Sequence, residues 1–411
     1  MKKIVASVVV LCGINALKAQ SGKTLPKDSV YSKNIEEVIV TSSYGTQKLK
    51  EEVVGSIVTL KSEDIITSQP FESIDKMIVG LAPGVQIGNN TELAKPVNIN
   101  IRGLGSLVPL NGFLGTSTQP LIIVDGIIMR EDLPFNEAFF DGGNNAETNI
   151  NPLARFNSDN VESINILKDA AAVSLYGAEA ANGVILITTK KGKRGKPSYS
   201  ISSQYGVSQS INKVKYLSGQ QYAQVYNDYN KNNSASGSGT YPWNGTDVNW
   251  FDVMNGNGDF FRTNFTVSGG VKHFNYRVGI DYSKNNESKI MNSLEKKGID
   301  ATLGLDYGKL KVNLYAAFNN LYKFQPNTYF NFILAPDRAI YDENGNFALS
   351  GSNGVPNPLA AAHQNLVDVD NNSLLSSLNV NYEIAKGLKI NTLFGVDISD
   401  KTNRDWKSGL N

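Results

Sequence analysis

The sequence has few of the residues on which most metal and nucleophile chemistry depends. Its 411 residues include two histidines, His273 and His363, and one cysteine, Cys12. Imidazole and thiolate groups are the usual ligands of zinc, and they supply or activate many catalytic nucleophiles. The Gly-x-Ser-x-Gly, His-Glu-x-x-His and P-loop motifs are also absent from the sequence. We therefore expect no enzyme active site, no metal site and no cofactor site.

Charge and hydropathy exclude two further classes of protein. The 39 basic and 38 acidic residues leave a formal net charge of +1, which provides no global attraction for nucleic acid. The only apolar run that approaches the length of a membrane-spanning helix is at the N-terminus, so a polytopic helical membrane protein is excluded. Hydrophobic residues make up 41% of the chain, which is enough for a folded core.

The first residues have the pattern of a targeting segment. Lys2 and Lys3 precede an apolar stretch that is too short to cross a bilayer, and Ala19 offers a small residue for cleavage. This pattern predicts a secretory signal peptide over residues 1–20. Cys12 lies inside it, and lipid attachment at this cysteine is the alternative. If the peptide is removed, the mature chain has no cysteine and therefore no disulfide.

A short β-prone stretch lies in the polar lead that follows, residues 21–50. Its residues are Glu36, Glu37, Val38, Ile39, Val40 and Thr41. A strand between loosely structured segments can add to the sheet edge of another protein through its backbone groups. The alternative, which the pattern alone favours, is an edge strand of the chain's own domain.

Residues 51–197 mix short strands with helical spacing, which predicts an α+β domain. Turns are expected at Asp125-Gly126 and Asn182-Gly183, and the basic run 190–196 reads as a solvated linker. A helix is expected between Phe71 and Leu81, and Asp169 can cap a second one. Strand candidates rich in Val, Ile and Leu are 53–60, 97–101, 121–124, 161–167 and 184–187.

Several motifs of this domain occur in the order found in one family of transporters. They are APGVQI (82–87), IRG (101–103), PLIIVDG (120–126), VESINILKDA (161–170), LYG (175–177) and ANGVILITTKKG (181–192). On these residues the chain resembles the plug of SusC/RagA-type TonB-dependent outer-membrane transporters, and the last motif is the most diagnostic. The positions that carry the resemblance are Arg102, Gly103, Asp125, Gly126, Lys168, Asp169, Tyr176, Gly177, Asn182 and Gly183.

The resemblance implies a function and a set of partners. Glu36 to Thr41 would match the TonB box, the strand that the energising protein TonB grasps, although Ser42 and Ser43 precede Tyr44 where the family usually continues with Gly-Tyr-Gly. The implied activity is import of a bulky oligosaccharide or peptide across the bacterial outer membrane. The implied partners are TonB, a SusD-like surface lipoprotein, outer-membrane lipid and the substrate, with no nucleic acid.

Period-two alternation dominates residues 198–411. Alternating apolar and polar residues fill about seven stretches, which are 199–207, 261–267, 274–283, 299–307, 310–319, 378–383 and 390–397. One apolar and one polar face suit strands of about ten residues in a transmembrane β-barrel. A secreted soluble binding or adhesion protein, with a sandwich half exposed to water, would show the same alternation and is the alternative.

The connections favour the membrane interpretation. Two long ones, 209–260 and 321–373, and a medium one, 284–297, alternate with short ones near Lys272-His273, Gly308-Lys309 and 385–387. Outer-membrane barrels have short periplasmic turns and long outer loops, whereas a sandwich has no reason for this asymmetry.

The number of strands is too small for a barrel that holds a plug. Plugged transporters have about 22 strands, which at the spacing seen here would need roughly 650 residues beyond the plug. The expected fold is therefore β-rich, with an α+β plug over 51–197 and then the first strands of an incomplete transmembrane β-barrel over 198–411. We expect the chain to be the N-terminal portion of a longer protein and inactive alone.

The long connections contain further candidate residues. Trp243, Trp250 and Phe251 could stack on sugar rings or contact a lid protein, and loop packing is an equal alternative. Asp368, Asp370 and Asn372 imitate the start of a calcium loop, but Ser373 stands where such a loop needs glycine. A solvated loop is the expectation there.

Overall fold

The computed structural model describes residues 39–41, 47–49, 57–61, 73–88, 93–95, 97–103, 119–129, 150–169, 173, 176–232, 240–326, 334–348 and 357–407. All of them belong to the unit Val38–Asn411. The expected signal peptide and the residues Glu36, Glu37 and Val38 lie outside the described residues.

The apolar runs of the N-terminal half form a five-stranded sheet, which we call the mixed sheet. Its order is β3-β8-β9-β6-β7, in which β6 and β9 are parallel and the other neighbours are antiparallel. β6 is buried along its whole length and β9 nearly so, which explains why both read as continuous apolar runs. The strands are β3 (Ile57–Lys61), β6 (Leu121–Val124), β7 (Ile127–Met129), β8 (Val161–Leu167) and β9 (Val184–Thr189).

Two small antiparallel pairs accompany the mixed sheet. β1 (Ile39–Thr41) pairs with β2 (Gln47–Leu49), and β4 (Val85–Ile87) pairs with β5 (Ile99–Ile101). Among the described residues β1 has no other strand beside it, so this stretch is neither isolated nor an edge of the mixed sheet.

The helices are short, and several begin at an asparagine. The side chains of Asn151, Asn157, Asn249 and Asn357 each accept a backbone N–H at the start of a helix, which satisfies a donor that has no partner inside the helix. Of the helices in the described ranges, none has the length and apolar character needed to cross a membrane. The helices are α3 (Ile74–Ile78), η3 (Pro152–Arg155), η4 (Ser158–Asn160), η6 (Ala178–Ala180), α6 (Gly219–Asn232), α7 (Trp250–Met254) and α8 (Pro358–Gln364).

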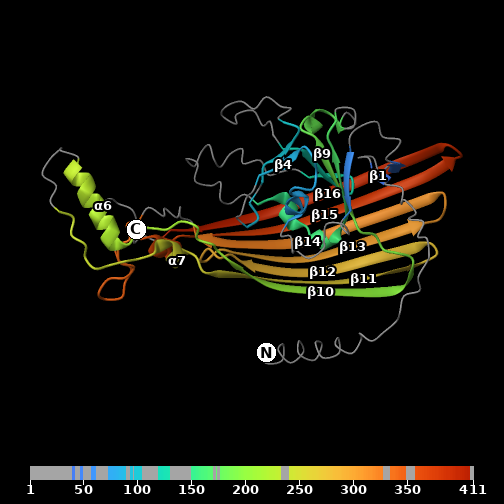
Figure 1. The fold of residues 1–411 in the computed structure, drawn as a ribbon. Helices are drawn as coiled ribbons and strands as arrows, with labels where there is room; N and C mark the ends of the chain where they lie inside the picture. Colours follow the sequence, from blue (N-terminus) through green and yellow to red (C-terminus); the bar gives the residue numbers. More distant parts are fainter. Residues whose placement is uncertain are drawn as a thin grey trace, which may run out of the picture. The chain divides into compact units, whose positions relative to one another are not determined.

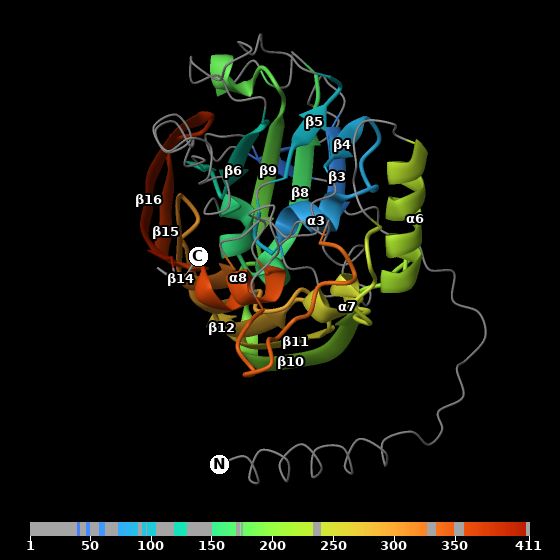
Figure 2. The same cartoon turned by 90° about the vertical axis from the view of Figure 1, so that its left-hand side faces the viewer.

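The C-terminal half forms a second, separate sheet of seven antiparallel strands, which we call the long sheet. Its strands follow chain order, and β10 and β16 are its two edges (Figure 1). Figure 2 shows that the long sheet is curved and that the mixed sheet lies on its concave side. The strands are β10 (Gly195–Gln209), β11 (Asn257–Val271), β12 (Phe274–Asn286), β13 (Ser293–Asp306), β14 (Leu310–Pro326), β15 (Leu366–Ala385) and β16 (Leu388–Trp406).

The expected asymmetry of the connections is confirmed. Short turns join β11 to β12, β13 to β14 and β15 to β16, and Gly308 and Gly387 supply positive φ angles of +70° and +87° in two of them. The long connections, which carry α6, α7 and α8, leave the other end of the strands (Figure 1). This arrangement confirms the expected fold class, an α+β unit followed by seven strands of an open, barrel-like sheet.

The strands of the long sheet are longer than the sequence predicted. β12 has 13 residues and β15 has 20, where about ten were expected. The apolar and polar alternation ends before the strands do, because outward positions beyond the apolar stretch are polar, as at Asn320, Asn372 and Asp400. Both faces are polar there, while the strand pairing continues.

The loop expected around Asp368 is in fact part of strand β15, so that expectation was wrong. Alternation places Asp368, Asp370 and Asn372 on one face, where their side chains form hydrogen bonds with neighbouring strands. Asn320 donates to Asp370 and Asn372 at 2.7 and 3.0 Å, and Arg404 donates to Asp368 at 2.8 Å.

Two smaller expectations also need correction. The helix expected to reach Leu81 ends at Ile78, and Leu81 lies in the following turn with 45% of its surface exposed. The strand β7 was not predicted, because three residues are too few for a period to be read.

Candidate functional site

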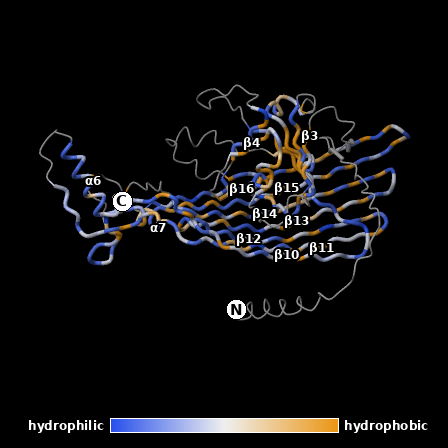
Figure 3. Tube along the Cα trace, viewed as in Figure 1, coloured by the Kyte–Doolittle hydropathy of each residue, from blue (hydrophilic) through white to orange (hydrophobic). Residues whose placement is uncertain are grey.

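The outer face of the long sheet carries apolar side chains in a continuous row across all seven strands. The register aligns them one beside the next, and their exposed fractions range from 38% at Leu374 to 76% at Ile201. Figure 3 shows the apolar and polar alternation along these strands. The row consists of Ile201, Phe265, Ile280, Ile299, Phe318, Leu374 and Ile398.

The inner face has the opposite character. Asn264, Asp281, Asn319 and Ser373 occupy a neighbouring row that points toward the mixed sheet, and each has 6% or 7% of its surface exposed. Polar side chains are therefore buried while large apolar ones are exposed, which is the reverse of a water-soluble sandwich. Transmembrane barrels alternate in this way, with apolar residues facing lipid.

Asp125 joins two of the sequence motifs. Asp125 and Gly126 have φ angles of +46° and +88° in the turn between β6 and β7. The Asp125 carboxylate accepts a hydrogen bond from the Thr189 backbone N–H at 3.0 Å and another from the Thr189 hydroxyl. Burial raises the pKa of Asp125 above its usual value, and the two Thr189 hydrogen bonds oppose that shift. Asp125 thus binds the last residue of β9 to the β6–β7 turn.

Two further motif contacts form on one side of the mixed sheet. Arg102, with a φ of +56°, forms an ion pair with Asp169. The neighbouring Lys168 ammonium donates to the Pro83 carbonyl at 2.5 Å. Desolvation lowers the pKa of Lys168, and the nearby Arg102 guanidinium adds to that effect. Motifs from residues 82–87, 101–103 and 161–170 therefore meet at one place.

The remaining motif positions shape the backbone. Gly177 has a φ of +76° at the start of η6, and Tyr176 packs against the cluster that contains Ala180. Asn182 is 6% exposed. Gly183 has a φ of +98°, and its carbonyl accepts the Leu121 N–H at 2.9 Å, which aligns β6 with β9. These motif residues build the fold of the mixed sheet, and none of them forms a catalytic constellation.

Sequence reasoning missed a group of residues that joins the two sheets through segment 151–160. Asn160 donates to Asp300 at 2.5 Å, and Arg277 donates to Asn160 at 2.6 Å and to Asp300 at 2.5 Å. These three side chains are at most 6% exposed. The signal that could have found them is a charged residue at an inward position of an alternating strand, as at Arg277 and Asp300.

Two more cations of the long sheet hold the same segment. Arg262 lies 3.0 Å from the Asp159 carboxylate and donates to Asn157 at 2.5 Å. Lys296 donates to the carbonyls of Ala154 and Phe156 at 3.3 and 2.8 Å. Because the donors belong to β11, β12 and β13, these strands supply most of the polar contacts to segment 151–160.

The two histidines lie at opposite ends of the long sheet. His273, in a short turn, stacks on Tyr307 with ring centroids 4.7 Å apart. His363, on α8 in a long connection, stacks on Phe347 at 5.8 Å. The structure therefore does not bring them together into a shared site.

The two tryptophans of the first long connection differ in burial. Trp250 is 4% exposed, and its indole N–H lies 3.3 Å from the Ala335 carbonyl, so it serves loop packing. Trp243 is 43% exposed. The Tyr241 hydroxyl donates to Asp337, and burial together with that carboxylate raises the pKa of Tyr241 to about 12.

Comparison with known proteins places this geometry in a family. The family described as the TonB-dependent receptor plug domain matches residues 50–184. TonB-dependent receptor P3 of Formosa agariphila is 26% identical over 378 residues, which cover 88% of this chain and 34% of that protein. TonB-dependent receptor SusC of Bacteroides thetaiotaomicron is 28% identical over 298 residues, covering 70% of this chain and 26% of SusC. Residues 50–184 match the plug domain of TonB-dependent receptors, and the chain is similar to SusC/RagA-type TonB-dependent receptors.

Solved structures agree at the level of the fold. The RagAB peptide importer in the open-open state superposes with a TM-score of 0.68 and 21% identity, over 90% of this chain and 43% of that chain. The chain spans between a quarter and about a third of the length of these curated relatives, with 34% for P3 and 26% for SusC. Below, the plug is the region matched at 50–184 together with its exit segment to residue 194, and the wall is the long sheet.

Proposed function

We propose that this receptor imports a bulky nutrient, an oligosaccharide or a peptide, across the bacterial outer membrane. The observation that carries the proposal is the arrangement of the wall, which is the reverse of a water-soluble sheet. Its apolar row is exposed on the outer face, and its buried polar inner face contacts the plug. Such a wall suits lipid outside and a hydrated lumen inside. The RagAB peptide importer, with the same fold, supports the peptide option.

The proposed organisation follows the same logic. A signal peptide over 1–20 directs export, and the lead over 21–50 carries the TonB-binding stretch from Glu36 to Thr41. The plug over 51–197 blocks the lumen of the barrel to which residues 198–411 contribute. No catalytic residue is proposed, because the family consists of transporters.

TonB would act by strand addition. Ile39, Val40 and Thr41 already pair with Leu49, Lys48 and Gln47 in the β1–β2 hairpin, and β1 has no second strand beside it among the described residues. Main-chain hydrogen bonds along such an edge can bind a partner strand and transmit a pulling force. A SusD-like surface lipoprotein would cover the outer loops and retain the substrate.

Deletion of residues 36–41 tests this function. Introduced into the gene in the bacterium of origin, it should abolish growth on the oligosaccharide or peptide source that requires the gene, because TonB loses its strand. The amount of receptor in the outer membrane and its binding of that nutrient at the cell surface should not change.

A deletion of equal length in the lead, residues 24–29, is the matched control and should leave growth intact. If growth survives the loss of 36–41, the proposed coupling is wrong. Loss of receptor from the membrane in either strain would show a folding defect instead. For that case Val40→Pro is the second variant, because it removes a backbone donor and fixes φ without shortening the chain.

A further inference from the structure

The plug is held unequally by the two halves of the wall. Toward β11–β13 it is held by side-chain hydrogen bonds from Arg262, Arg277, Lys296 and Asp300, and by the ion pair between Arg262 and Asp159. Every one of these contacts ends on segment 151–160 of the plug. The charges involved are largely shielded from water, and separating buried charges from their partners is among the costliest changes in a protein interior.

Toward β14–β16 the contacts recorded among the described residues are mainly apolar. Tyr315 and Ala317 of β14 and Leu375 of β15 join the buried cluster of the mixed sheet, which includes Ile127. At β16, a Cβ added to Gly395 would lie 2.9 Å from Cγ1 of Ile127, so the Ile127 side chain packs directly against the β16 backbone. Apolar surfaces can slide past one another without leaving unpaired charges, because their attraction has no fixed direction.

Among the described residues, one ion pair joins the plug to strands β14–β16. Arg155 of the plug lies 3.5 Å from Asp397 of β16, a longer separation than the 3.0 Å between Asp159 of the plug and Arg262 of β11. The polar attachment to β16 is therefore the looser of the two.

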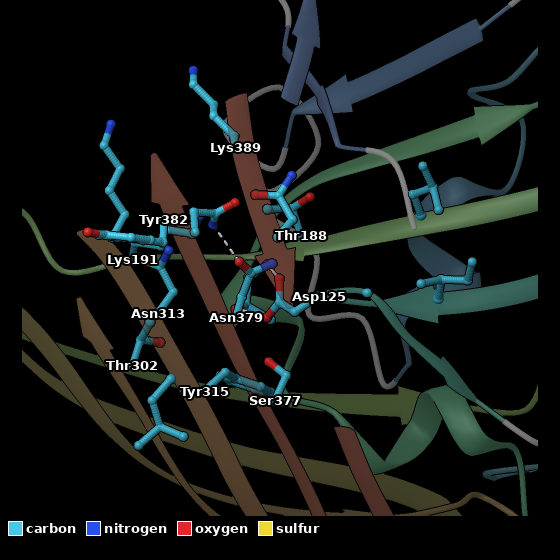
Figure 4. Close-up of a pocket in the computed structure, with 18 of the residues that line it drawn as sticks. Asp125, Thr188, Lys191, Thr302, Asn313, Tyr315, Ser377, Asn379, Tyr382 and Lys389 are labelled. Carbon is cyan, nitrogen blue, oxygen red and sulfur yellow. Dashed lines mark hydrogen bonds between the residues drawn. The ribbon is translucent and has the colours of Figure 1, made fainter. Parts of the chain in front are cut away.

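A cavity already separates the plug from this half near the short turns. Its volume is about 470 Å³, and it is lined by Asp125 and Thr188 of the plug and by Asn313, Ser377 and Asn379 of the wall (Figure 4). Lys191, Lys311 and Lys389 also line it, and none of these ammonium groups forms an ion pair with a carboxylate in the described ranges. The lining suits a hydrated solute with hydroxyl, amide or carboxylate groups.

We propose that the plug stays attached to β11–β13 during transport and that the passage opens along β14–β16, continuous with this cavity. The inference rests on the proposed function, since it assumes that TonB displaces the plug. The contacts of Asn160 with Arg277 and Asp300 then stay intact during transport. The contacts of Ile127 and Arg155 with β16, including the pair with Asp397, are broken. The nutrient then leaves through an amide- and lysine-lined route, which suits a hydrophilic cargo.

Two asparagines in one row of the wall provide a matched test. Asn275 of β12 and Asn379 of β15 lie in the same transverse row, linked through Gly304 and Asn313, and both are partly buried on the inner face. Asn275→Cys and Asn379→Cys, each in a Cys12→Ser background, are exposed in cells to a membrane-impermeant maleimide, with and without working TonB. Leakage of the reagent through other pores is independent of TonB and so cancels in the comparison.

We expect TonB to accelerate labelling of Asn379→Cys severalfold and to leave labelling of Asn275→Cys unchanged. Equal acceleration at both positions, acceleration at Asn275→Cys alone, or acceleration at neither would overturn the inference. The proposed function would survive each of these results if deletion of residues 36–41 still abolishes growth, so the two failures can be told apart.

Disulfide locks provide the second measurement. The pair Ile127→Cys and Gly395→Cys ties the plug to β16, and the pair Asp159→Cys and Asn264→Cys ties it to β11, where the native side chains meet at 3.3 Å. Oxidation of the first pair should stop nutrient-dependent growth reversibly, and oxidation of the second should not. Growth that stops only with the second lock, or with both, would contradict the assignment, and growth of the reduced strains shows that the variants fold.

Discussion

At the scale of single residues, the motif glycines serve different purposes that the sequence alone cannot separate. Gly183 and Gly103 have nearly equal φ angles, +98° and +97°, so an L side chain is strained at either position. Only at Gly183 is there also a close neighbour, because an added Cβ would lie 2.8 Å from Cδ1 of Ile101 and 3.2 Å from the Leu167 carbonyl oxygen. At Gly103 an added Cβ would have no atom of the described residues within 4 Å, apart from the glycine and its chain neighbours.

Gly183→Ala should therefore destabilise the plug more than Gly103→Ala. We expect a loss of about 1–3 kcal/mol in free energy of unfolding from the backbone conformation at either site. Gly183→Ala should lose about 1–3 kcal/mol more, because the added methyl group overpacks the core. Pulse proteolysis of the detergent-solubilised protein in urea measures the difference. Equal losses for the two variants would mean that the close approach to Ile101 is relieved by a small shift.

At the scale of elements, segment 151–160 is the part of the plug that fixes its position on the wall. Asn160 satisfies both Arg277 and Asp300, so Asn160→Ala leaves two buried charged groups each short of a partner. We expect the variant to lose about 1–3 kcal/mol of stability, the usual cost of an unsatisfied buried polar group. The protease susceptibility of the plug in outer-membrane preparations measures the effect.

Arg194→Ala is the matched control for that variant. Arg194 also joins the plug's exit segment to the wall, through Asp306 at 2.8 Å, but its side chain is 49% exposed. Exposed pairs contribute about 0–1 kcal/mol, so Arg194→Ala should change protease susceptibility little. A larger effect of Arg194→Ala than of Asn160→Ala would show that burial is not what makes the contact at Asn160 important.

The elements also show how far the sequence can predict this fold. The apolar runs 121–124 and 161–167 correspond to β6 and β8, and the short turns at His273 and Gly308 are where the alternation placed them. Strand ends were missed, because beyond Asn320 and Asp400 both faces are polar and the period disappears. The contact between plug and wall was missed for a different reason, since Asn160 and Asp300 are 140 positions apart and only the tertiary structure brings them together.

At the scale of the whole molecule, the direction of the strands determines which segments face the cell exterior. If the wall spans the outer membrane, the long connections lie outside and the short turns lie in the periplasm. Tyr229 on α6 is 61% exposed at the end of the long sheet that carries the long connections. Lys309 is exposed in a short turn at the opposite end. Ile280 lies between them in the outward apolar row and is 53% exposed. Lipid would cover Ile280 although neighbouring protein does not.

Single cysteines at these three positions, in a Cys12→Ser background, should therefore give three different labelling patterns. A water-soluble impermeant maleimide should label Tyr229→Cys on intact cells, and should label Lys309→Cys only after the cells are broken. Ile280→Cys should stay unlabelled in both preparations, because the reagent does not enter the hydrocarbon layer where that side chain would lie. A secreted soluble protein would expose all three cysteines to water equally. Labelling of Ile280→Cys at the rate of Tyr229→Cys would therefore exclude the membrane wall, and with it the import function.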